Sequence, residues 1–238
     1  MVGFDYERCF KSFLDSINFN LVDLTICFDG SLLEYDNHFT SKYQKKYKFK
    51  TNLIDTNSFT GKSYGNDGSS KSGCLVAQII KQDNVPENSL IFILENDYIF
   101  RPIDWASITL DLYNNYINDN VYCSLYEHLD TYIFTRTDCN NEWSMYKDLQ
   151  SKIFLSSYCR WRIIPCITSS WIMPKNVFDR DFDLHSVGIS DNTGSLEFRN
   201  RGSICIGPLM PIMTHSESYF LAPFCDWNKI LDSVEIIK

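Results

Sequence analysis

Glu95 and Asp97 follow directly after an apolar run, residues 90–94, and one residue separates them. The length of this run, between the turn-forming Pro86 and Pro102, predicts a strand buried on both faces. Side chains two positions apart in an extended segment leave on the same side, so both carboxylates should point the same way. Two hard oxygen ligands at a strand end are typical of a Mg²⁺ or Mn²⁺ site that also holds substrate phosphates. The alternative is an acidic surface turn.

A second carboxylate, Asp29, follows the predicted strand 21–28 in the turn Asp-Gly-Ser. A carboxylate in this position can accept a hydrogen bond from a base or ribose hydroxyl, as in dinucleotide-binding folds. The same three residues also form a capping turn without any ligand. Both interpretations of Asp29 therefore stay open.

The Gly- and Ser-rich segment 64–73 contains Asn66 and Lys71 and precedes a predicted helix. Backbone N–H groups at a helix start attract phosphate, and Lys71 would add positive charge. The segment is not a P-loop, because the pattern G-x-x-x-x-G-K-[ST] is absent. A flexible surface loop is the equal alternative.

His128 and His215 each lie just past a predicted strand. An isolated histidine is more often a structural hydrogen-bonding group than a ligand, but its position at a strand end favours a role in a site. We therefore keep His128 and His215 as candidate site residues.

Composition excludes several classes of protein. The chain has 238 residues, a net charge of -8 and a pI near 5.0, which argues against general nucleic-acid binding. Its nine Cys contain no C-x-x-C pair, as expected of free thiols in a reducing compartment. The basic segment 42–50 has interleaved aromatics that could stack nucleobases, but a solvated helix face is the better interpretation. Neither a signal peptide nor a transmembrane segment is predicted, so we expect a cytoplasmic protein.

Predicted helices alternate with predicted strands, which implies an α/β fold with a central, mostly parallel sheet flanked by helices in a single domain. The predicted helices are 5–17, 35–46, 70–82, 105–116, 191–200 and 226–234, and the predicted strands are 21–28, 50–54, 90–95, 121–126 and 163–173.

Over roughly residues 26–227, these motifs resemble the GT-A-fold, nucleotide-sugar-dependent glycosyltransferases. The segment 28–31 is similar to the acidic turn that meets the nucleotide, and 65–72 to the loop and helix start that follow it. Glu95-Asn96-Asp97 resembles the metal-binding D-x-D motif in an E-x-D form, in which Asp97 contacts the metal directly. Thr214-His215 is similar to the C-terminal histidine that often completes the metal site.

The resemblance implies a Rossmann-like GT-A domain over residues 1–238, with a nucleotide-sugar-binding half at 1–120 and an acceptor-binding half at 121–238. The implied activity is Mn²⁺- or Mg²⁺-dependent transfer of a hexosyl or pentosyl group from a nucleotide-sugar donor to a glycan hydroxyl. Segments 124–128 and 220–227 are similar to uncharacterised bacterial and viral glycosyltransferase-like proteins. If the chain is virally encoded, the expected compartment is the cytoplasm of the host cell.

By this resemblance, the segment 168–171 and the acidic stretch to Asp191 hold the acceptor-binding residues and the general base, and His128 is a further candidate for contacting the acceptor. We predict Asp191 as the base, because it precedes a predicted helix in the acceptor half, and it would otherwise be only a helix cap. Asp181 and Asp183 are the next candidates for the base, and Trp171 and Asp183 are predicted to contact the acceptor.

The chain departs from the family pattern in two places. GT-A domains normally begin with a strand that helps to hold the base, whereas a helix is predicted here almost at once. Asn96 leaves only two acids in the motif. Two alternatives remain open. A nucleotidyltransferase would favour a Gly-rich basic loop near the N-terminus, where Gly3 is the only glycine before Gly30. A glycan-binding module could retain the fold without catalysis.

Overall fold

The computed structural model describes residues 5–65, 68–117, 120–127, 151–167, 170–216 and 221–237. Within these ranges the main sheet has six strands in the order β3-β8-β5-β9-β7-β6. Their bounds are β3 Leu90–Leu94, β5 Val121–Cys123, β6 Ile153–Leu155, β7 Arg160–Ile163, β8 Ser170–Pro174 and β9 Ile204–Pro208. Two smaller ladders accompany it: β1 (Thr25–Asp29) runs parallel to β2 (Lys50–Ile54), and β4 (Tyr98–Phe100) runs antiparallel to β10 (Met213–His215).

The α/β class is confirmed, but the prediction of a mostly parallel central sheet is wrong. Among the described pairings of the main sheet, β5 and β9 run parallel and the other four pairs run antiparallel. Strand β6 returns into β7 through a tight turn, closed by the Ser156 N–H donating to the Cys159 carbonyl at 2.9 Å. Antiparallel neighbours can be joined this way without a crossover helix, so counting strands and helices along the chain does not fix strand direction.

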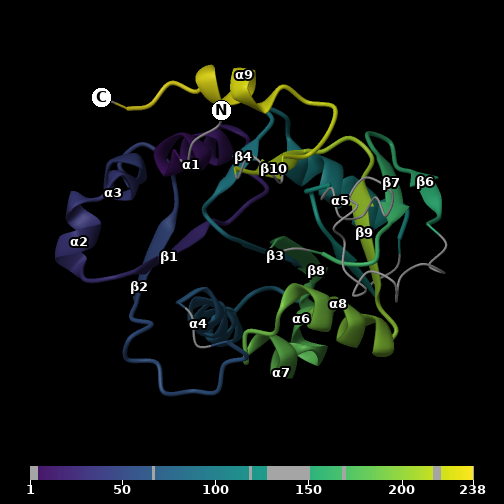
Figure 1. Ribbon diagram of the computed structural model, residues 1–238, viewed down its shortest axis with the longest axis horizontal. Helices are drawn as coiled ribbons and strands as arrows, with labels where there is room; N and C mark the ends of the chain where they lie inside the picture. The colour runs from purple at the N-terminus through teal and green to yellow at the C-terminus, as the bar shows by residue number, and fades with distance from the viewer. Residues whose placement is uncertain are drawn as a thin grey trace, which may run out of the picture.

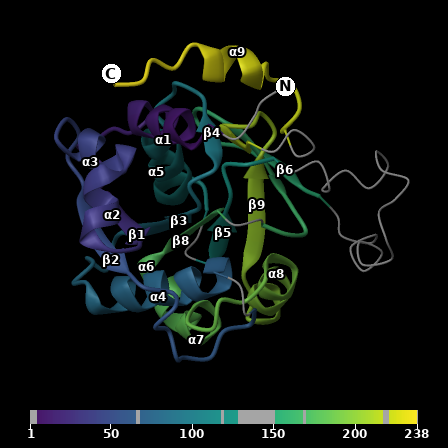
Figure 2. The same ribbon diagram turned by 60° about the vertical axis from the view of Figure 1, so that its left-hand side comes forward.

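Helices cover the main sheet on two sides (Figure 1), and the turned view in Figure 2 shows the same arrangement. One face packs on α1, α5 and α9, and the opposite face packs on α4, α6 and α8. Alternate residues of each strand enter the two cores: Ile172 faces the first, whereas its neighbour Met173 faces the second. The helices described are α1 Tyr6–Asp15, α2 Leu32–Asn37, α3 Phe39–Gln44, α4 Gly68–Gln82, α5 Trp105–Asn115, α6 Lys175–Arg180, α7 Phe182–His185, α8 Asp191–Asn200 and α9 Trp227–Asp232.

Most predicted helices are present, but the helix predicted at 35–46 is wrong. Two short helices, α2 and α3, occupy this region and meet at His38. Ser31 begins α2 with a capping box that includes Glu34. The His38 ring accepts a hydrogen bond from the Thr40 N–H and begins α3. The region forms two short helices and not one long helix, because Ser31 and His38 each cap a separate helix start. Each cap accepts a hydrogen bond from a backbone N–H that would otherwise have no partner.

The prediction of one strand at 163–173 is wrong: β7 ends at Ile163, and β8 spans Ser170–Pro174. The two strands run in the same direction and are separated in the sheet by β5 and β9. Apolar character alone does not reveal where the chain leaves one strand and enters another. The remaining helices and strands agree with prediction to within a few residues at their ends. No helix among the described residues combines the length and apolar character that crossing a membrane requires.

Helix α1 supports the strand that follows Asp97. Asp5 caps α1 by accepting a hydrogen bond from the Arg8 N–H at 3.0 Å. From the buried side of this helix, Ser12 Oγ accepts a hydrogen bond from the Phe100 N–H at 3.0 Å. Because Phe100 belongs to β4, the helix at the start of the chain holds in place the strand that begins beside the acidic motif.

Candidate metal centre and its surroundings

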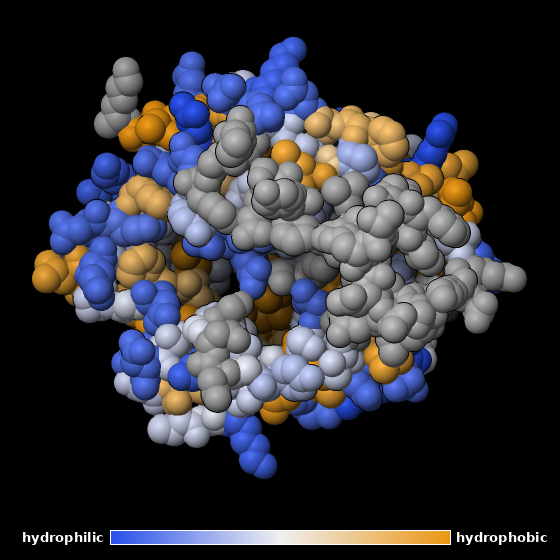
Figure 3. Space-filling model, in the orientation of Figure 1, coloured by the Kyte–Doolittle hydropathy of each residue, from blue (hydrophilic) through white to orange (hydrophobic). Residues whose placement is uncertain are grey.

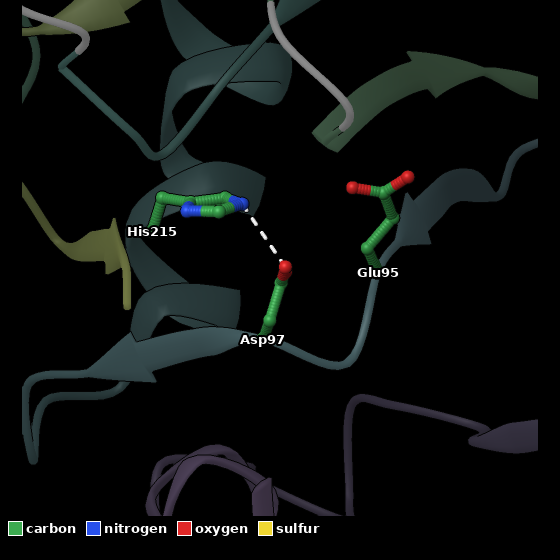
Figure 4. Close-up of side chains that lie close together, drawn as sticks. All are labelled: Glu95, Asp97 and His215. Carbon is green, nitrogen blue, oxygen red and sulfur yellow. Dashed lines mark ion pairs between the residues drawn. The ribbon is translucent and has the colours of Figure 1, made fainter. Parts of the chain in front are cut away.

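Within the described part of the chain, Glu95, Asp97 and His215 form a group whose ligand atoms all lie within 4.8 Å of one another. His215 Nε2 lies 3.0 Å from Asp97 Oδ2. Figure 4 shows the two carboxylates and the imidazole pointing toward a common space between them. All three residues are half-buried. The structure thus brings together the three side chains that the sequence predicted as metal ligands.

Backbone pairing fixes the position of this group. Glu95 follows the last residue of β3, and Asp97 precedes the first residue of β4. Tyr98 pairs in register with His215 of β10, and the Ser216 N–H donates to the Asp97 carbonyl at 2.8 Å. Strand β10 therefore carries His215 directly alongside the acidic motif.

The second oxygen of Asp97 marks an open ligand position. Asp97 Oδ1 is buried and makes no hydrogen bond to any described residue. Buried carboxylate oxygens in native proteins are normally paired, so such an atom requires an explanation. Two adjacent ligands of an octahedral ion lie about 3 Å apart when each is about 2.1 Å from the metal. The separation of 3.0 Å between His215 and Asp97 matches that spacing.

The electrostatics of the site also involve Tyr98, which the sequence analysis missed. Its ring is 2% exposed and lies edge-on to the ring of His215, with centroids 5.3 Å apart. Burial raises the pKa of the Tyr98 hydroxyl, and the negative charges of Glu95, Asp97 and Asp191 raise this pKa further. The phenol is therefore neutral at physiological pH. The sequence around Tyr98 does not distinguish it from an ordinary aromatic core residue, so its place beside the site could not be predicted.

Among the causes of the raised Tyr98 pKa, the negative charge of Asp191 has the smallest effect. Asp191 is the first residue of α8, and Ser190 occupies the N-cap position. The interpretation of Asp191 as the cap of this helix is therefore wrong, because the capping position belongs to its neighbour. A carboxylate in the first turn is still stabilised in its ionised form by the helix dipole.

The segment before α8 rests on the first turn of α4. Gly188 has φ +58°, and a Cβ at this position would overlap the carbonyl oxygen of Ser70. Close by, the Tyr64 N–H donates to the Val187 carbonyl at 2.6 Å. The start of α4, which holds Lys71, is thus in contact with the segment leading to Asp191. The sequence offers only a glycine in a loop as a signal for this contact.

The two other acids considered for the base form ion pairs with arginines. Arg201 donates to both carboxylate oxygens of Asp183 at 2.7 Å each. Asp181 is fully buried and bonds to Arg180, Arg201 and the Tyr122 hydroxyl. Burial alone would raise the pKa of Asp181, but hydrogen bonds from Arg180 and Tyr122 lower it. These contacts give both acids a structural role in joining α6, α7 and the end of α8.

The remaining predicted residues occupy several places in the fold. Asp29 lies at the end of β1 and accepts hydrogen bonds from the Thr56 N–H and hydroxyl at 3.1 and 2.7 Å. Trp171, on β8, pairs in register with Ile93 and stacks near His185 of α7, with ring centroids 5.1 Å apart. Asn66 and His128 lie outside the described residues.

The face of the molecule drawn in Figure 3 is hollowed near its centre. In the same orientation, Figure 1 draws β3 and β8 at this place. The floor of the hollow is apolar, and hydrophilic residues lie along part of its rim. A recess of this kind suits a ligand with both apolar and polar surface.

Comparison with known proteins does not assign the chain to a family: no protein-family model matches it, and neither does any curated protein.

Proposed function

We propose that this protein transfers a sugar from a nucleotide-activated donor to a hydroxyl acceptor at the site formed by Glu95, Asp97 and His215. The observation that carries the proposal is the convergence of these three ligand atoms within 4.8 Å, next to an orphaned carboxylate oxygen of Asp97. Carboxylate oxygens suit Mg²⁺ and Mn²⁺, and an added imidazole favours a transition metal such as Mn²⁺.

The three ligands would hold the ion where a donor diphosphate can share it. When bound there, Mn²⁺ or Mg²⁺ supplies the positive charge that a diphosphate leaving group requires. The protein is acidic overall, with a net charge of -8 from 22 basic and 30 acidic residues. Lys71 would add a second positive charge for the phosphates. It lies in the first turn of α4, where backbone N–H groups at the helix start also attract phosphate.

Asp191 would act as the general base that removes the proton from the acceptor hydroxyl. Two features support this role: its negative charge contributes to the raised pKa of Tyr98, which lies beside the metal ligands, and it lies in the first turn of α8, where the helix dipole favours a carboxylate. Asp183 is a weaker candidate, because its two oxygens already accept hydrogen bonds from Arg201. The proposal includes a GT-A-like fold, in which the main sheet has the parallel and antiparallel pairings described above.

The first test is calorimetric binding of UDP, GDP and dTDP, each with Mn²⁺ and with EDTA. We expect one nucleotide to bind in the presence of Mn²⁺ and affinity to fall when the metal is removed. Equal affinity under both conditions would rule out a metal-bridged diphosphate. A panel of nucleotide sugars then tests catalysis, because a transferase with no acceptor present slowly hydrolyses its own donor. Donor binding without any hydrolysis or transfer would instead identify a binding module.

A further inference from the structure

Five lysines project from one short stretch of the surface. We call them the lysine ridge: Lys42, Lys45, Lys46, Lys48 and Lys50. All five are exposed, on α3, in the turn that follows it and at the start of β2. None of them makes an ion pair with a carboxylate among the described residues. By contrast, Lys11, Lys81 and Lys175 each lie within ion-pair distance of an aspartate.

The lysine ridge has a charge opposite to that of the whole chain. Residues 32–50 contain five lysines against only Glu34 and Asp36, whereas the full sequence carries a net charge of -8. Unpaired cations concentrated on one edge of an acidic protein create a local positive field. Such a field attracts a polyanionic surface even when the molecule as a whole is repelled by it.

The aromatic side chains between the lysines are buried or half-buried, and the Nζ atoms of Lys11 and Lys46 each lie 5.8 Å from the centroid of the Tyr47 ring. Tyr43 is fully buried and Phe49 is 9% exposed, and both belong to the core that packs on α1. The Tyr47 hydroxyl donates a hydrogen bond to Asp15 at 2.8 Å. Binding to single-stranded nucleic acid relies on aromatic faces that are open to bases. The ridge offers charge without such faces, which argues against nucleic acid as its partner.

Exposed leucines lie on α2, the helix that precedes the ridge in the chain. Leu32 and Leu33, in the first turn of α2, are 61% and 73% exposed. Helices α2 and α3 lie side by side at one edge of the molecule in both ribbon views (Figures 1 and 2). Peripheral membrane binding combines these two elements: apolar side chains enter the headgroup boundary, and basic side chains are attracted to anionic lipids. A nucleic acid, unlike a bilayer, offers no apolar layer that the two leucines could enter.

We propose that the α2–α3 edge, with its lysine ridge and the Leu32–Leu33 pair, docks the protein on the anionic surface of a lipid bilayer. The charge complementarity selects acidic headgroups, and the two leucines select a bilayer over a soluble polyanion. This surface is built from residues other than Glu95, Asp97, His215 and Asp191. It therefore stands independently of the proposed activity.

The test is co-sedimentation of the full chain with phosphatidylcholine vesicles prepared with and without phosphatidylserine. We expect binding only where phosphatidylserine is present, and progressive loss of binding as salt is raised, because screening weakens surface attraction. The triple variant Lys42→Gln, Lys45→Gln, Lys46→Gln should bind at least tenfold more weakly, since each lysine near the surface contributes roughly fivefold. The variant Leu32→Ser, Leu33→Ser should also weaken binding, with the salt dependence kept.

The matched control removes three exposed lysines outside the ridge, Lys62, Lys152 and Lys229, by the same change to Gln. It alters net charge equally, so it should leave vesicle binding within about twofold of the parent if position rather than total charge matters. Circular dichroism checks that each variant is folded. Absence of phosphatidylserine-dependent binding would overturn the proposal, as would an equal loss in the control. Tighter binding to a single-stranded oligonucleotide than to the vesicles would also overturn it.

Discussion

His215 Nε2 lies 3.0 Å from Asp97 Oδ2, although the two residues come from opposite halves of the chain. The contact has two chemical interpretations: a simple ion pair, or two ligands of one metal ion. The orphaned Oδ1 of Asp97 and the nearby carboxylate of Glu95 favour the second, because an ion pair alone would leave that buried oxygen unsatisfied.

Changing Asp97 to Asn should abolish Mn²⁺-dependent nucleotide binding and reduce transfer by ~10²–10³ or more, the usual effect of losing one key electrostatic group. The amide keeps the shape of the side chain but lacks its charge, so the fold should persist. Calorimetry with Mn²⁺ and a thermal melt measure the two effects. Asp36→Asn is the matched control, because it removes an exposed acid on α2. Normal Mn²⁺ binding by the Asp97 variant would mean that the contact is only an ion pair.

Changing Asp191 to Asn should slow transfer by ~10²–10⁴ while donor binding in Mn²⁺ stays normal. The reason is that an amide cannot take a proton from an acceptor hydroxyl, although it can occupy the same place in the first turn of α8. Stability should fall by about 1 kcal/mol at most, through the lost interaction with the helix dipole. Steady-state kinetics and calorimetry measure the two quantities separately. Transfer at the parental rate would show that another group is the base.

Changing Gly188 to Ala should destabilise the fold by about 1–3 kcal/mol, because a non-glycine residue at positive φ is strained and its Cβ would meet the carbonyl oxygen of Ser70. Donor binding should weaken as well, since the contact supports the start of α4. The control is Gly73→Ala within α4, where a Cβ meets no atom within 4 Å. This second change should stabilise the helix by roughly 0.5–1 kcal/mol. Urea melts compare both variants, and similar effects at the two positions would contradict the packing argument.

Acidification should destabilise the fold through His185. This side chain is 3% exposed, and burial lowers its pKa from 6.5 to about 4. Between these two values the unfolded chain binds a proton that the folded chain excludes, so stability falls as pH drops from 6.5 toward 4. The full loss is about 3 kcal/mol, at about 1.4 kcal/mol for each pKa unit.

The test compares urea unfolding of the parent and of His185→Phe from pH 7 down to pH 4. Phenylalanine fits the aromatic cluster in which His185 stacks on Phe178 and Phe198, and it does not titrate. The variant should therefore lose less stability than the parent over this range. Asp181, whose pKa is lowered below 3.8, titrates beneath the window and does not disturb the comparison. Parallel curves for the two proteins would mean that His185 does not control the acid response.

Local patterns in the sequence were sufficient for the acidic half of the site. The apolar run of β3 and its abrupt end at Glu95 depend on neighbouring residues alone, and the structure has them where they were predicted. The direction of β3 relative to β8 was not predictable in this way, because it depends on how the chain returns from a distant segment. Strands β4 and β10 have only three residues each, too few for a periodic signal, yet their pairing brings His215 to Asp97.

The second group of acids shows a different limit. Asp181 and Asp183 are visible as acids in the sequence, and nothing local distinguishes them from Asp191. What separates them is a partner: Arg201 comes from the far end of α8 and pairs with both. The identity of an ion-pair partner is decided by tertiary packing. For this reason, the sequence of residues 121–238 does not show which carboxylate is free to act as a base and which is held in an ion pair.

Gly188 links two helix starts that belong to different halves of the chain. The backbone of Gly188 packs directly against the Ser70 carbonyl in the first turn of α4. Asp191, the first residue of α8, follows three residues later. The two starts must therefore shift together or break the contact. Under the proposed function, a phosphate that shifts the first turn of α4 would also shift Asp191. The absence of a side chain at Gly188 thus fixes the spacing between the start of α4 and Asp191. Under the proposed function, this is the spacing between the donor phosphates and the base.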